Sequence, residues 1–348
     1  MTVSGSGLGV TVRRLRRFLI TVITGGLVLA ALYYLPTGYV LVSPGPVRDL
    51  SQVIKVTGGA ADSSGRVLLT TINSRDAGPL LYLYGMVNPK ADLTPQSAVV
   101  PPGQDRDEYW EYQRRLMEES QAAAKVAALA YLGYEASLVG TGVMVMDLLP
   151  SSPSEGLLKP GDLITMVDGV TVNIAGDLLD YMARKTPGEP VRLEISRAGE
   201  TRTLEVPTEA HPSEGRAIMG VLVTTAGFDA EIPLEIHIEI QGITGPSAGL
   251  MFSLEIVNQL SPGDLTRGMT VAGTGTITGN GVVGPVGGVR QKVFAAEREG
   301  AEVFLVPVEN FTEAISAASR VRVVPVTSLA EALQALRESG LETGEPPD

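Results

Sequence analysis

The feature that most restricts how this chain can fold is a turn rich in glycine and proline at residues 242–249, with the sequence GITGPSAG. It opens directly into an apolar run at 250–257, which predicts a buried helix that begins close to Ser247. Further along, the i, i+3, i+4, i+7 spacing of a second predicted helix, 289–299, places Lys292 on its apolar face. The fold must therefore bury a lysine on one helix and begin another at a serine.

A lysine on a buried face is costly unless it is neutral or paired. An apolar pocket favours the neutral amine, because burying the ammonium form costs desolvation energy. A neutral lysine can take the proton of a serine hydroxyl, whereas an arginine could not, because its pKa stays above about 12. Ser247 and Lys292 therefore form a candidate Ser-Lys dyad, a variant of the Ser-His-Asp arrangement. On spacing alone, a lysine whose stem packs while its amine reaches water is an equally good interpretation.

Composition excludes several other kinds of chemistry. The 348 residues are 44% apolar, which allows two or three domains with real cores, and the net charge of -12 argues against a nucleic-acid partner. There is no cysteine, and the two histidines, His211 and His237, stand in no metal-ligand spacing. No P-loop motif is present. We therefore expect no metal, no nucleotide and no other cofactor.

The N-terminal sequence predicts a membrane anchor. Four arginines at 13–17 precede 18 uncharged residues, 18–35, which as a helix would be about 27 Å long. The positive-inside rule then places 1–17 in the cytoplasm and everything after the span outside it, in a single-pass protein of the cell membrane. A cleaved signal peptide is the alternative, but no convincing cleavage site precedes Pro36, which favours an uncleaved anchor.

Residues 36–137 predict a small juxtamembrane β region followed by a helix. Short runs rich in β-branched residues at 39–42, 53–56 and 67–72 are separated by glycine and proline. A long helix is then expected at 105–132, ended by Gly133. We interpret this helix as a spacer or packing element.

Residues 138–207 follow a different pattern, with the stretch SPSEGLLKPGDLI at 152–164, VDG at 167–169 and a helix after it. This order resembles a PDZ domain of the type found with bacterial proteases. The resemblance implies that an extended peptide adds as a strand to a sheet edge, with its terminal carboxylate bound by backbone N–H groups of a glycine-rich loop. Two alternatives stay open: a PDZ domain that only packs on the rest of the chain, and an Asp162 that serves turn chemistry rather than function. The resemblance assigns the loop to Gly140, Thr141 and Gly142, and the start of the receiving strand to Val143, Met144 and Val145.

Residues 208–340 predict a mixed α/β domain, before a tail at 341–348. Strands are expected at 218–224, 234–240, 269–272 and 302–307, and helices at 249–260, 289–299 and 328–339. The segments GPSAG at 245–249, TGTIT at 274–278 and GVVGPVGGVRQK at 281–292 resemble, in that order, the proteolytic domain of Lon proteases.

That resemblance implies roles for single residues. Ser247 would be the nucleophile and Lys292 the general base, with Thr274 close enough to bond the lysine amine. The turn residues Gly245, Pro246 and Ala248 would shape a site for the oxyanion, with the backbone N–H of Ser247 among its donors. Thr276 stands where the family commonly has an acidic residue. This departure leaves the role of Thr274 less firmly assigned than the roles of Ser247 and Lys292.

The whole order resembles the membrane-anchored PDZ and Lon-type proteases of bacteria. It implies a multidomain α/β (α+β) chain that acts as an ATP-independent serine endopeptidase, cleaving proteins outside the cytoplasm with selection by the PDZ domain. The expected partners are protein substrates, the membrane and further copies of the chain, such as the hexameric rings of Lon-type domains. A regulatory sheddase of specific partners, and an inactive PDZ scaffold, are the alternatives.

Overall fold

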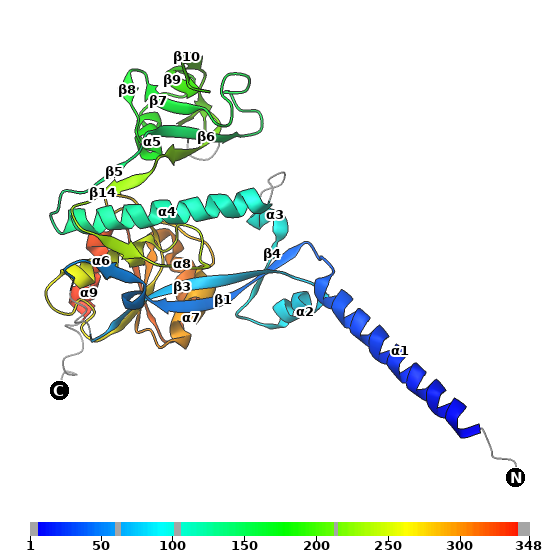
Figure 1. The fold of residues 1–348 in the computed structure, drawn as a ribbon. Helices are drawn as coiled ribbons and strands as arrows, with labels where there is room; N and C mark the ends of the chain where they lie inside the picture. The colour runs from blue at the N-terminus through cyan, green and yellow to red at the C-terminus, as the bar shows by residue number, and fades with distance from the viewer. Residues whose placement is uncertain (1–5, 60–63, 101–105, 212–214, 340–348) are drawn as a thin grey trace, which may run out of the picture.

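The structure is a computed structural model that describes residues 6–59, 64–100, 106–211 and 215–339. The predicted tail at 341–348 lies outside this part of the chain. Figure 1 shows a long N-terminal helix, a larger α/β body and a smaller body that stands above the long helix α4.

The larger body is built on a six-stranded sheet that draws on both halves of the sequence. β3 pairs antiparallel with β1 on one side and parallel with β16 on the other. Residues 36–137 are thus not a separate juxtamembrane region, which corrects the predicted boundary: their strands complete the sheet of the C-terminal domain. In spatial order the strands are β20 (Arg322–Val326), β19 (Val303–Pro307), β16 (Thr270–Gly273), β3 (Arg66–Asp76), β1 (Tyr39–Asp49) and β4 (Asp92–Pro95).

Helices cover both faces of this sheet, because side chains that alternate along the buried strands point to opposite sides. In β19, Val303 and Leu305 belong to the core with α6, whereas Phe304 and Val306 belong to the core on the other face. α6 is buried on nearly every side, as its all-round apolar sequence predicts. The first face carries α4 (Arg106–Tyr131), α6 (Gly249–Leu260) and α9 (Leu329–Ser339), and the second carries α7 (Val289–Arg298) and α8 (Phe311–Ala317).

The smaller body has its own sheet and core. Its last strand, β13, lies beyond the predicted boundary at residue 207, so the domain continues to residue 226. It is inserted in the larger body: the two connecting segments, β5 (Ser137–Val139) and β14 (Asp229–Glu231), pair with each other beside α4 (Figure 1). Its sheet order is β10 (Glu200–Val206), β9 (Val191–Arg197), β7 (Leu163–Val167), β6 (Gly142–Leu148) and β13 (Val221–Ala226), with α5 (Ala175–Ala183) packed on it.

The remaining elements are short. They are η1 (Leu50–Gln52), β2 (Ile54–Val56), α2 (Pro79–Val87), α3 (Gln96–Val99), β8 (Val170–Thr171), β11 (Glu209–Ala210), β12 (Ala217–Ile218), β15 (Ile236–Ile238), β17 (Thr276–Ile277), β18 (Val283–Gly284) and η2 (Val308–Asn310). β2 pairs with β15, which ties the N-terminal half to the strand that leads into the serine turn.

The N-terminal helix α1 (Ser6–Tyr34) differs from the predicted span. It begins twelve residues before Phe18 and continues through the arginine cluster, so the charged segment and the uncharged one form a single helix. Among the described residues, none of the helices combines the length and the apolar character needed to cross a membrane. The predicted transmembrane helix at 18–35 is therefore not supported.

Candidate active site

The turn that carries Ser247 is fixed by contacts with α4. Gly245 has a left-handed backbone with φ of 85°, and its N–H donates to the carbonyl of Gln113, 2.9 Å away. The hydroxyl of Ser120 donates to the carbonyl of Pro246 at 2.9 Å. A side chain at Gly249 would come within 2.8 Å of the Ser120 hydroxyl, so the first turn of α6 needs glycine there. The turn and α4 thus pack as one unit around the serine.

Lys292 lies on α7 with its amine against this turn. Its Nζ is 3.0 Å from Ser247 Oγ and 2.9 Å from Thr274 Oγ1, and the residue is only 3% exposed. Burial lowers the pKa of Lys292 from 10.5 to about 7, against the weaker opposing effect of the negative charge on Glu313. The alternative of a lysine that reaches water is therefore wrong, because the amine ends at a serine hydroxyl inside the protein. A neutral amine at this distance can accept the proton of that hydroxyl.

Thr274 connects the Lys292 amine to the backbone of Ser247. Its hydroxyl donates to the carbonyl of Ser247 at 3.0 Å and accepts from the Lys292 amine. The N–H of Gly275 donates to the same carbonyl at 3.0 Å. The structure thus places Thr274 within hydrogen-bonding distance of both Ser247 and Lys292. Thr276 lies in the β17–β18 hairpin and has no contact with the dyad among the described hydrogen bonds.

A cleft of about 720 Å³ opens on the dyad. One wall is the C-terminal half of β3, including Thr71 and Ser74. β16 pairs with β3 only as far as Leu69, so within the described strands this half of β3 has a partner on one side alone, β1. An open strand edge can bind an extended peptide by main-chain hydrogen bonds. The cleft is also lined by the serine turn and by Tyr109 and Trp110 on α4.

The sequence did not single out Gln113, Ser120 or Trp110, although all three border the turn or the cleft. They lie on the helix interpreted as a spacer or packing element. The contacts of Gln113 and Ser120 with the turn span more than a hundred positions in the sequence, and no local pattern marks such a contact. No group of three or more histidine or acidic side chains in the described parts of the chain could hold a metal ion.

In the smaller body the structure moves the expected peptide-binding edge to another strand. β6, which begins at Gly142 and contains Val143, Met144 and Val145, lies between β7 and β13 and has no open edge. The backbone N–H groups of the preceding loop already have acceptors within the protein. Thr141 N–H donates to Ala226 O, and Gly142 N–H donates to Asn173 O. At Gly140 a side chain would collide with the carbonyl of Asn173.

The last strand of that sheet is β13. Leu222 on it is 47% exposed, and α5 packs alongside, with the N–H of Ala175 donating to Thr225 Oγ1 at 2.9 Å. The open edge beside the helix is therefore that of β13, a strand outside the predicted PDZ segment.

Asp162 has the structural role that turn chemistry suggested. Its carboxylate accepts a hydrogen bond from Lys159 N–H and pairs with Arg197 at 2.6 Å.

Comparison with known proteins finds a family match in each of the two bodies. Residues 130–208 match the PDZ domain family, and residues 229–338 match the Lon protease (S16) C-terminal proteolytic domain. These matches confirm the two predicted resemblances and support a serine-type endopeptidase.

Similar proteins include two Lon proteases. That of Phenylobacterium zucineum is 32% identical over 154 residues, and that of Anaeromyxobacter dehalogenans 28% identical over 246 residues, or 42% and 68% of this chain. The chain spans only 19% and 28% of the length of these two relatives. Among solved structures, the PDZ domain of an SdrC-like protein from Listeria monocytogenes is 25% identical, with 24% of this chain and 87% of that chain covered and a TM-score of 0.23.

Proposed function

We propose that this chain, in which a PDZ domain is inserted in a Lon-type proteolytic domain, is a serine endopeptidase with Ser247 as nucleophile and Lys292 as general base. One observation carries the proposal: the buried Lys292 amine lies 3.0 Å from Ser247 Oγ, with a pKa lowered to about 7. At that pKa a large fraction of the enzyme holds a neutral base at neutral pH.

The reaction follows from this geometry. Lys292 accepts the hydroxyl proton while Ser247 Oγ attacks the peptide carbonyl, and the resulting ammonium protonates the departing amine. Water then attacks the acyl-enzyme while Lys292 takes its proton. The bond between Ser247 Oγ and the acyl carbon breaks, Lys292 returns the proton to Ser247 Oγ, and the new C-terminus is released. The backbone N–H of Ser247 stabilises the oxyanion, and such a donor lowers the barrier by about 3 to 4 kcal/mol.

We further propose that substrates bind as extended chains. The open edge of β3 beside the cleft supplies main-chain hydrogen bonds next to the dyad. The open edge of β13 in the PDZ domain selects substrates by the same mode of binding. We also propose that cleavage proceeds without ATP, as the resemblance to the membrane-anchored PDZ and Lon-type proteases implies.

The test is hydrolysis of an unfolded protein such as casein by the full chain without ATP, compared with Ser247→Ala and Lys292→Ala. We expect cleavage by the wild type and none by either variant. Cleavage that survives Lys292→Ala would refute the assignment of the base.

Two other functions predict different results in the same system. An inactive PDZ scaffold would leave casein intact, and the intact dyad argues against it. A regulatory sheddase would cleave few proteins, so Ser247→Ala used as a trap would retain one or two partners, whereas a general protease would retain a broad mixture.

Assembly and location are separate proposals that rest on the sequence resemblance. We propose a homo-oligomer, which analytical ultracentrifugation of the full chain would test. We also propose action outside the cytoplasm, as the resemblance to the PDZ and Lon-type proteases of bacteria implies. A C-terminal reporter that is active on only one side of the membrane would test that location.

A further inference from the structure

Ser120 is a buried polar side chain with a single described partner. It is 4% exposed, and its hydroxyl donates to the carbonyl oxygen of Pro246 at 2.9 Å. The other described donor to this carbonyl, the N–H of Gly249, is 3.4 Å away and therefore weak. The direction of the Pro246 carbonyl is thus determined mainly by Ser120.

That carbonyl belongs to the same peptide unit as the N–H of Ser247. A trans peptide unit is planar, so its C=O and N–H point in opposite directions and turn together. By holding the carbonyl of Pro246, Ser120 fixes the direction of the N–H that would stabilise the oxyanion. Among the described hydrogen bonds, that N–H has no acceptor of its own.

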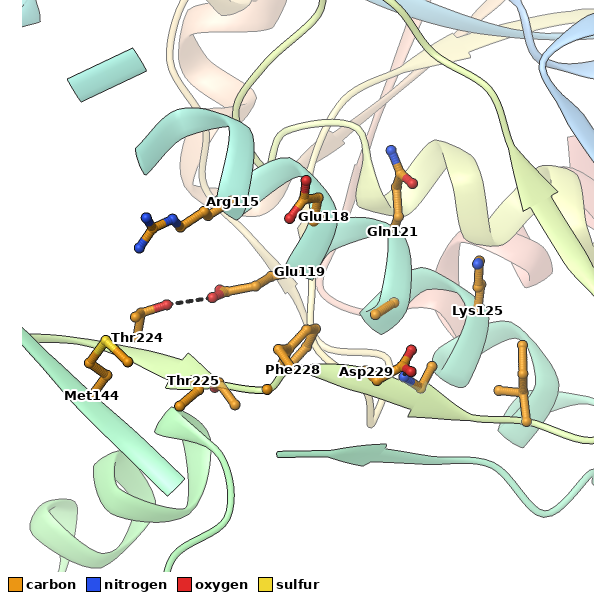
Figure 2. A pocket seen from close by; sticks show the side chains of 15 residues that line it. Arg115, Glu118, Glu119, Gln121, Lys125, Met144, Thr224, Thr225, Phe228 and Asp229 are labelled. Carbon is orange, nitrogen blue, oxygen red and sulfur yellow. Dashed lines mark hydrogen bonds between the residues drawn. The ribbon is translucent and has the colours of Figure 1, made fainter. Parts of the chain in front are cut away.

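The residue before Ser120 binds the PDZ domain. Glu119 accepts a hydrogen bond at 2.7 Å from the hydroxyl of Thr224, which is 7% exposed and lies on the edge strand β13. Figure 2 shows these two side chains pointing toward each other across the space between α4 and β13. Burial raises the pKa of Glu119, an effect that the Thr224 hydroxyl partly offsets.

Adjacent residues of one helix therefore contact two domains. Glu119 contacts the strand that the PDZ domain offers to peptides, and Ser120 contacts the peptide unit beside the nucleophile. The paired connecting strands β5 and β14 also lie against α4 (Figure 1). A displacement of β13 relative to the larger body would thus act on α4 next to Ser120.

We propose that Ser120 is a positioning residue for the oxyanion site, and that Glu119 and Thr224 connect its placement to the edge strand of the PDZ domain. This inference rests on the proposed serine endopeptidase function. In this proposal α4 regulates the oxyanion site, because the helix contacts both the turn that carries Ser247 and the PDZ domain.

The test uses the full chain, a short fluorogenic peptide and a peptide boronate, whose tetrahedral adduct with a serine resembles the transition state. For Ser120→Ala we expect kcat to fall about tenfold, less than the loss for removal of a whole oxyanion donor, and the boronate to bind about tenfold more weakly. KM should stay within about twofold, because the ground-state carbonyl uses the oxyanion donors less than the transition state does.

Ser253→Ala is the matched control. Ser253 is also a buried serine, and its hydroxyl bonds the carbonyls of Ala124 on α4 and Gly249, but not that of Pro246. It should leave kcat and boronate affinity within about twofold of wild type. An equal loss in Ser253→Ala and Ser120→Ala would show that α4–α6 packing, not orientation of the peptide unit, is responsible, and would overturn the proposal.

Thr224→Val tests the connection to the PDZ domain and stays informative if Ser120→Ala does not fold. It removes the hydroxyl donor to Glu119 with little change in volume and leaves the backbone of Thr225, which also bonds Glu119, unchanged. We expect kcat and boronate affinity to fall about threefold, a typical size for coupling through one shared contact. An unchanged kcat in Thr224→Val would refute the connection. A wild type that never reacts with the boronate would instead refute the proposed function itself.

Discussion

Replacing Lys292 with methionine should abolish activity and stabilise the fold. Methionine has a similar length and no charge, so it fills the same buried position without the cost of keeping an amine neutral. The cost follows from the pKa, which burial lowers from 10.5 to about 7. One pKa unit corresponds to about 1.4 kcal/mol, so at pH 7 the lysine destabilises the folded state by about 4 kcal/mol.

Part of this gain is lost in the variant. The amine contacts two hydroxyl groups, those of Ser247 and Thr274, and each such hydrogen bond contributes about 1 kcal/mol. The net expectation is a stabilisation of about 2 kcal/mol at pH 7.

The sign of the pH dependence follows from proton binding. Between about pH 7 and 10.5 the unfolded lysine is protonated while the folded one is mostly neutral, so the unfolded state binds more protons and wild-type stability rises with pH. Methionine has no such dependence. From pH 7 to pH 9, the wild type should therefore recover about 2 kcal/mol relative to Lys292→Met.

Urea unfolding followed by tryptophan fluorescence measures this difference. Trp110 is the only tryptophan and lines the cleft beside Ser247 and Lys292, so it reports on the larger body. Lys55→Met, a change at an exposed position of β2, is the control and should show no comparable gain. A Lys292→Met variant that is less stable than wild type at pH 7, or a difference that is constant from pH 7 to 9, would refute a buried neutral amine.

Three further predictions concern activity and the PDZ domain. First, kcat/KM for a short peptide should rise with pH up to about 7 and then level off, because protonated Lys292 is no base. A pH profile in which kcat/KM is constant from pH 6 to 8 would contradict this prediction. Second, Thr274→Val should lower kcat about tenfold or more, because the amine and the Ser247 carbonyl lose a shared partner; steady-state kinetics that match wild type would exclude an orienting role. Third, Asp162→Asn should destabilise the PDZ domain by about 3 kcal/mol, since it breaks a buried pair with Arg197. Calorimetry would measure that loss, and a larger effect on short-peptide hydrolysis than on unfolding would argue against a purely structural Asp162.

The sequence by itself determined the parts of the site that depend on local pattern. A glycine-proline turn before an apolar run is a local signal, and it predicted that a buried helix, α6, begins close to Ser247. Helical spacing put Lys292 on a buried face, where the structure has it. Asp162 as a turn residue was likewise predictable, because its bond to Lys159 N–H spans three positions.

Tertiary structure alone decided how distant segments combine. Nothing local in β3 indicates its pairing with β16, about two hundred positions later, so residues 36–137 looked like a separate region. The open edge of the PDZ sheet depended in the same way on β13, which pairs with β6 from beyond the predicted domain and closes the edge that sequence favoured. The contacts of Ser120 and Gln113 with the nucleophile turn are also long-range. Hydrophobic periodicity specifies which face of an element is buried, but the partner of that face is chosen by packing and hydrogen bonding across the whole chain.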